Sequence, residues 1–94
     1  MYLDIGNNRL IAERNIVGIF DLEITSQSHR TRAFLRRAQE NNEVSDDCEN
    51  LPRSFLVCTY PYHPKLVCLS ELRTGTLAGR IEAYAARKPL GETE

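Results

Sequence analysis

The sequence predicts an α+β domain, with a small, mostly antiparallel sheet of about five strands and two helices in the order βββαββα. Short apolar runs of strand length lie within residues 1–21, and the connections between them are too short to hold a helix. Two later segments carry apolar residues at helical spacing. A chain of 94 residues suits one small domain, which we place at residues 1–88, followed by a flexible tail at 89–94.

The first two strands are predicted from alternation and from the turn between them. Residues 1–5 alternate exposed and apolar side chains, which is typical of a half-buried strand, and residues 10–12 form a second apolar run. Gly6-Asn7-Asn8 lies between them and consists of residues that tolerate positive φ. Because this connection is so short, we expect the two strands to pair antiparallel.

The next strand is the most apolar part of the chain. Residues 15–21 read Asn-Ile-Val-Gly-Ile-Phe-Asp, a nearly continuous apolar run of the kind found in strands that are buried on both faces. We therefore expect it to be the central strand of the sheet. Gly18 interrupts the run, which indicates either the close approach of another backbone or a β-bulge, and the sequence leaves both open.

Two segments have the period of amphipathic helices. The residues able to cap them are Ser26 or Ser28 for the first helix and Thr74 or Thr76 for the second. The apolar stripes are Thr31, Phe34, Leu35 and Ala38 in the first helix and Leu77, Ile81, Tyr84 and Ala85 in the second. We expect the first helix to end near Asn41 and the second to stop before Pro89. The polar stretch 41–52 is expected to be a mobile loop.

Two further strands are expected at residues 55–58 and 66–69, joined by a hairpin loop that contains His63. Cys58 and Cys68 are placed symmetrically about this histidine, so a symmetric hairpin would make them cross-strand neighbours. The simpler interpretation is two small buried thiols. Cys58, His63 and Cys68 are the only candidate metal ligands, and their spacing matches no zinc pattern, so we expect no metal site.

Other features argue against an enzyme and against a membrane protein. The two histidines, His29 and His63, are not placed near a nucleophile with an orienting acid, so we expect neither catalysis nor a cofactor or small-molecule substrate. The number of cysteines is odd and the N-terminus has no signal-peptide pattern, which predicts a cytoplasmic protein with reduced thiols. No apolar stretch is long enough for a membrane-spanning helix.

Charge is balanced in total but segregated along the chain. Twelve basic and 13 acidic residues give a formal net charge of -1, which by itself gives no argument for nucleic-acid binding. However, residues 30–37 contain four arginines and no acid, whereas residues 40–49 contain five acids and no base. Arginines in the first turn of a helix oppose the macrodipole. They form either a solvated face paired with Glu40 and Glu43 or a surface for an anionic partner.

Five short segments resemble, in order and spacing, the RemA/RemB family of bacterial extracellular-matrix (biofilm) regulators, and within it the RemB branch. The segments are Tyr2–Gly6, Ile11–Asp21, Arg53–Val57, Leu69-Ser70 and Thr76–Arg80. The resemblance covers about residues 1–87, apart from the loop 41–51. It implies an α+β subunit that assembles into closed rings and, for the RemA branch, a DNA-binding regulator that activates matrix genes.

The resemblance also implies which residues face DNA. The family places basic residues in the turn between the second and third strands and just before the fourth strand, where this chain has Arg14 and Arg53. The chain departs from the RemA pattern in two ways. The basic residue of the turn falls about one position later in RemA, at the position of Asn15, and Leu51 and Pro52 stand where RemA has adjacent arginines.

We therefore expect a non-enzymatic, DNA-binding transcriptional regulator of extracellular-matrix genes that acts as a homo-oligomeric ring on double-stranded DNA. Arg14 and Arg53 would contact phosphates, with Arg32 and Arg36 as auxiliaries. Contacts of this kind position a protein without reading the base sequence. The alternative is an oligomeric protein-interaction or scaffold module without DNA binding, in which the arginines of the first helix form the subunit interface through salt bridges.

Overall fold

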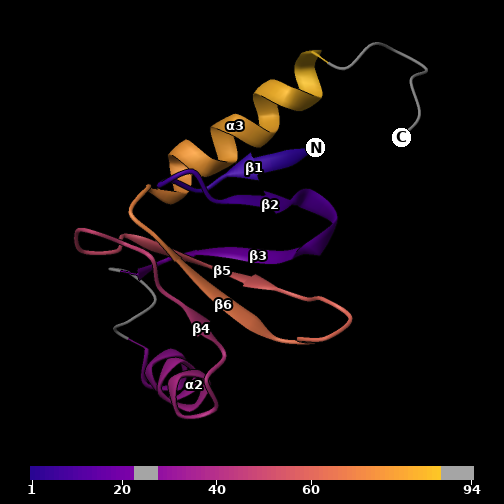
Figure 1. Ribbon diagram of the computed structural model, residues 1–94. Coiled ribbons are helices and arrows are strands. Elements are labelled where there is room, and N and C mark those ends of the chain that lie inside the picture. Colours follow the sequence, from indigo (N-terminus) through magenta and orange to yellow (C-terminus); the bar gives the residue numbers. More distant parts are fainter. Residues whose placement is uncertain (23–27, 88–94) are drawn as a thin grey trace.

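The computed structural model describes residues 1–22 and 28–87 (Figure 1). The strands are β1 (Tyr2–Asp4), β2 (Leu10–Ala12), β3 (Ile16–Asp21), β4 (Val44–Ser45), β5 (Ser54–Cys58) and β6 (Leu66–Ser70). A short 3-10 helix, η1 (Glu13–Asn15), joins β2 to β3, and the α-helices are α2 (His29–Glu40) and α3 (Thr74–Arg87). The predicted α+β class is confirmed. Ser26 and the predicted tail at 89–94 lie outside the described residues.

The N-terminal hairpin forms as expected from its sequence. β1 pairs antiparallel with β2, with Leu3 opposite Ile11. The turn between them has φ values of 103° at Gly6, 55° at Asn7 and 61° at Asn8. These residue types adopt positive φ at low cost, so the turn chemistry and the alternation together determine the register of this hairpin.

The other strands form a four-stranded sheet in the order β3-β5-β6-β4. The β3–β5 and β5–β6 pairs are antiparallel, whereas β4 runs parallel to β6. β4 lies within the stretch 41–52, which was expected to be a mobile loop, and this expectation is wrong for its first part. The amide of Val67 donates to the carbonyl of Glu43 at 2.7 Å, which holds the start of β4 against β6.

β3 is an edge strand, so its assignment as the central strand is wrong. Its apolar run does not mean burial on both faces, because Val17 is 67% exposed and Phe20 is 40% exposed. The pairing register shifts between Ile16 and Gly18, which makes Val17 the extra residue of a β-bulge and confirms that alternative. A Cβ atom on Gly18 would lie 2.8 Å from the ring of Phe20, so the glycine leaves room for that ring.

The sheet is the middle layer of the molecule, and Figure 1 shows α3 with the β1–β2 hairpin on one side and α2 on the other. The larger core cluster lies on the hairpin side and consists of Leu3, Ile5, Ile11, Leu56, Cys58, Cys68 and Leu77. The smaller cluster lies on the α2 side and consists of Ala38, Phe55 and Val67. Successive residues of a strand point to opposite faces of the sheet, so Leu56 belongs to the larger cluster and Phe55 to the smaller one.

Two buried serines join the layers. The hydroxyl of Ser70 donates to the carbonyl of Ile5 at 2.7 Å and accepts from the amide of Leu72 at 3.0 Å. The hydroxyl of Ser54 donates to the carbonyl of Leu72, also at 2.7 Å. Both serines are fully buried, and these bonds satisfy their hydroxyl groups. They connect the end of β1 to the end of the four-stranded sheet.

The helix boundaries follow local chemistry at α2 but not at α3. The hydroxyl of Ser28 accepts from the amide of Thr31 at 3.4 Å, and α2 ends at Glu40 with Asn41 as its C-cap, as predicted. The predicted threonine caps of α3 are wrong, because the helix already begins at Thr74. The carbonyl of Arg73 accepts from the amide of Leu77, which puts Arg73 in the N-cap position.

Candidate nucleic-acid interface

The structure separates the two arginines that the family resemblance assigns to DNA. Arg14 lies in η1 just before β3, and Arg53 lies just before β5. The two strands are antiparallel, with Asp21 of β3 opposite Ser54 of β5, so the arginines lie at opposite ends of one strand pair. A strand advances about 3.3 Å per residue, which puts them about 20 Å apart. One subunit therefore does not offer them as a single site.

The backbone of Arg53 is fixed by hydrogen bonds, whereas its side chain is exposed. Its amide donates to the carbonyl of Ser70 at 2.8 Å, and its carbonyl accepts from the amide of Leu22 at 3.0 Å. The side chain lines a shallow recess together with Asn50, Leu51 and Glu71. Arg53 is thus an exposed cation on a rigid support, with one carboxylate nearby.

At about 3.6 residues per turn, Arg32 and Arg36 lie beside Gln39 on one flank of α2. On the same flank, Leu35 and Gln39 line a cavity with Pro52, the residue before Arg53. Arg32 and Arg36 are both exposed. The structure therefore gathers three of the four predicted site residues at one end of the molecule, and we call Arg32, Arg36 and Arg53 the basic end.

Two acids of the segment 40–49 pair with basic residues outside α2. Glu43, which could have paired with that helix face, has a carboxylate oxygen 3.5 Å from the Nζ of Lys65. Asp47 lies 3.8 Å from Arg9, whose guanidinium also donates to the carbonyl of Leu69. The side chain of Arg9 is only 16% exposed, so this arginine positions the acidic segment and is not available to a ligand.

Glu71 holds three segments together. Its carboxylate accepts from the side-chain amide of Asn7 at 2.8 Å, from the backbone amide of Glu49 at 2.8 Å and from the side-chain amide of Asn50 at 3.0 Å. The bond from Asn7, followed by those from Asn50 and Glu49, lowers the pKa of Glu71 to about 2. Sequence reasoning missed this residue, because its partners are far apart along the chain and follow no motif.

Acidification is expected to release this clamp. A carboxyl group with a lowered pKa stabilises the fold above its unfolded pKa, and this contribution is lost as the pH falls through the folded value of about 2. We expect Glu71→Gln to produce the same loosening at neutral pH, seen as faster hydrogen exchange at the Glu49 amide. Glu82→Gln on α3 is the matched control. Unchanged protection of the Glu49 amide in Glu71→Gln would contradict the clamp.

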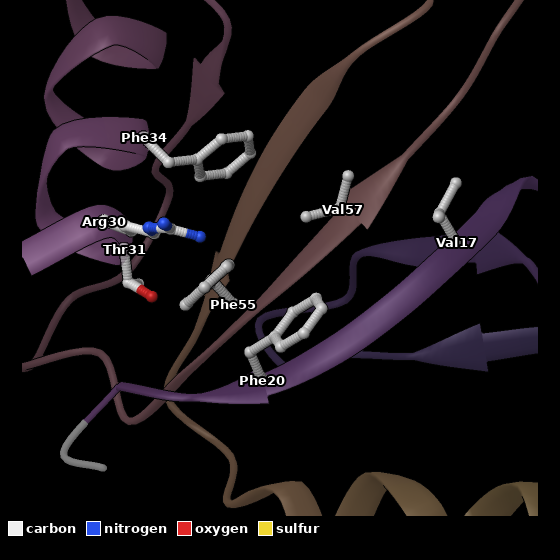
Figure 2. A pocket seen from close by; sticks show the side chains of 7 residues that line it. All are labelled: Val17, Phe20, Arg30, Thr31, Phe34, Phe55 and Val57. Carbon is white, nitrogen blue, oxygen red and sulfur yellow. The ribbon is translucent and has the colours of Figure 1, made fainter. Parts of the chain in front are cut away.

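A second feature was not visible in the sequence. Val17, Phe20, Phe34, Phe55 and Val57 line a cavity of about 340 Å³ between α2 and β3, with Arg30 and Thr31 at its rim (Figure 2). We call it the β3 groove. Residues 17 and 20 would point to opposite faces of a regular strand, and only the bulge at Val17 brings both side chains to the same face.

The thiols do not form a site of their own. Cys58 lies opposite Leu66 and Cys68 opposite Leu56, so the two cysteines are diagonal rather than direct cross-strand neighbours. Both are free and buried, and a hydrogen bond to Cys68 together with burial raises the pKa of the Cys58 thiol, so it stays protonated. Within residues 1–22 and 28–87, no three His, Cys, Asp or Glu side chains could hold a metal ion.

Comparison with known proteins does not assign the chain to a group. No protein-family model matches it, and no curated protein matches it. In the described part of the chain, no helix has the length and apolar character needed to cross a membrane.

Proposed function

We propose that the protein is a cytoplasmic, DNA-binding transcriptional regulator of the RemA/RemB-like family that controls extracellular-matrix genes as a homo-oligomeric ring. The observation that supports DNA binding best is the basic end, where Arg32, Arg36 and Arg53 are exposed at one end of the subunit. The resemblance of five sequence segments to these matrix regulators supports the class of target genes.

The chemistry of the basic end suits phosphate groups. A guanidinium donates two parallel hydrogen bonds to a phosphate, which fixes position without reading the base sequence. Three arginines beside an acidic segment bind DNA weakly in one subunit. A ring repeats the set around its circumference, and each contact after the first is effectively intramolecular. Arg14 lies at the other end of the strand pair, so it meets the same duplex through a different part of the ring.

Salt dependence tests this proposal directly. We would measure fluorescence anisotropy with a generic duplex at about 50–300 mM salt, on protein whose mass is determined by light scattering. The expected result is a ring-sized species whose affinity falls steeply with salt, because each phosphate contact contributes about 0.9 to the slope of log affinity against log salt. A ring that does not bind DNA at the lowest salt concentration would overturn the proposal.

The second candidate is an oligomeric protein-interaction module without DNA binding. The β3 groove favours it, because an exposed apolar groove suits protein contacts rather than phosphates. The two candidates differ in one measurable property. Both predict an oligomer, but only the first predicts that the oligomer retains DNA and releases it as salt increases.

A further inference from the structure

Within residues 1–22 and 28–87, part of one sheet face is open at β3. On the α2 side, Phe34, Leu35 and Ala38 pack over β5, β6 and β4, but they do not extend across β3. Figure 2 shows Phe34 on one side of the β3 groove and Val17 and Phe20 on the other, with Phe55 and Val57 of β5 between them. The lining is therefore apolar and open to solvent.

The strand that borders this groove is an edge strand of the four-stranded sheet. β3 pairs with β5 on one side, and its other edge pairs with no strand of the described residues. It is six residues long and contains neither lysine nor proline, two residues that natural proteins use to block edge strands, and the bulge at Val17 is its one irregularity. An apolar groove beside such an edge is typical of a surface that a partner covers.

The rim of the groove carries positive charge. The guanidinium of Arg30 points toward the space between Phe34 and Phe55 (Figure 2), and Arg37 lies on the same flank of α2. Among the residues that the structure describes, no acid lines the groove. The surface that fits it best is therefore an apolar side chain flanked by carboxylates.

The chain itself carries such a surface. Leu51 is 86% exposed and lies two residues after Glu49, the last acid of the segment that contains Asp46 and Asp47, with Arg53 two residues further on. The Glu71 clamp holds this segment through Glu49 and Asn50, so Leu51 is presented next to a fixed loop. Tyr62 is equally exposed, but its loop, residues 60–64, contains no acid. Leu51 does not line the groove of its own subunit.

We propose that Leu51 and its acidic segment on one copy dock into the β3 groove of a second copy. This inference rests on the oligomeric assembly in the proposed function and specifies its interface. The two surfaces differ, so the contact is head-to-tail, and a head-to-tail contact produces a ring when its rotation closes. Part of the charge segregation along the chain then has a reason, because Arg30 and Arg37 at the rim of one copy face the acids before Leu51 of the next.

Two single variants and their mixture test the proposal. Val17→Asp places a carboxylate in the groove, and Leu51→Asp removes the apolar side chain that docks there. Each variant alone lacks one of the two surfaces on every copy, so we expect light scattering to show monomers. Mixed in equal amounts, they retain one intact interface, because Val17→Asp supplies Leu51 and Leu51→Asp supplies the groove. The expected product of the mixture is a dimer and nothing larger.

Exposed residues away from both surfaces provide the controls. Leu10→Asp on β2 and Tyr62→Asp in the β5–β6 loop should assemble as the parent chain does, and circular dichroism checks that every variant is folded. If Val17→Asp does not fold, Arg30→Glu replaces it in the same design, with at least about tenfold weaker self-association expected, since about 1.4 kcal/mol corresponds to tenfold.

Each failure has a separate meaning. If the parent chain is oligomeric and both Val17→Asp and Leu51→Asp keep its mass, the inferred interface is wrong while the proposed function stands. If only Leu51→Asp keeps the mass, the groove is an interface but Leu51 is not its occupant, and the inference is overturned. If the parent chain is a monomer, the ring of the proposed function fails as well.

Discussion

Replacing Arg32, Arg36 and Arg53 together by alanine is expected to lower the affinity for a generic duplex by roughly 100-fold or more at low salt, because each hydrogen bond to a charged group contributes about 1.5–3 kcal/mol. The slope of log affinity against log salt should fall by about 0.9 for each phosphate that no longer has an arginine partner. Anisotropy titrations of the triple variant and the parent chain over the same salt series measure both quantities.

The control for this variant is Arg80→Ala. Arg80 lies on α3, and its guanidinium donates to the carbonyl of Asp4 at 2.7 Å, so the substitution removes one arginine from the opposite layer. It should leave both the affinity and the slope unchanged. Arg14→Ala, measured separately, reports whether the distant end of the strand pair also contacts DNA. Unchanged DNA retention in the triple variant would contradict the basic end, and dissociation of the oligomer would assign these arginines to the subunit interface.

The largest expected effect on stability comes from Leu56→Ala. Leu56 lies on β5, is completely buried, and belongs to the cluster that joins the sheet to the β1–β2 hairpin and α3. Removing a buried leucine side chain costs about 2–5 kcal/mol in the free energy of unfolding. A domain of this size has about 5–14 kcal/mol in total, so the variant should be folded only marginally.

Urea unfolding followed by circular dichroism measures this effect, at one fixed protein concentration because self-association adds to apparent stability. Leu10→Ala is the matched control, since it removes the same atoms from a side chain that is 62% exposed. Its effect should stay within about 0.5 kcal/mol. Equal midpoints for the two variants would contradict the burial of Leu56 in the core.

The candidate site was only partly predictable. The arginine block and its position on a helix follow from spacing, and so does the division of that helix into two charged flanks. The groups that each flank contacts in the folded chain do not follow from spacing. Arg32 and Arg36 share one end with Arg53 because the loop before β5 returns beside α2, whereas Arg30 borders an apolar groove that exists only because β3 has a bulge.

The local features of this protein were determined by the sequence alone. Alternation and a turn of Gly and Asn residues define the first hairpin, and Ser28 and Asn41 bound α2, because these signals act between residues a few positions apart. The α+β class follows from the same short-range periods, since strand and helix periods differ in every window of the chain.

The order of strands was decided by the tertiary structure. An apolar run such as that of β3 is compatible with a central strand and with an edge strand that has an exposed apolar face. The sequence does not distinguish the two. The pairing of β4 with β6, the clamp at Glu71 and the distance between Arg14 and Arg53 likewise depend on contacts between segments that are distant in sequence. Such contacts depend on the positions of both segments in the folded chain, so a local sequence pattern does not predict them.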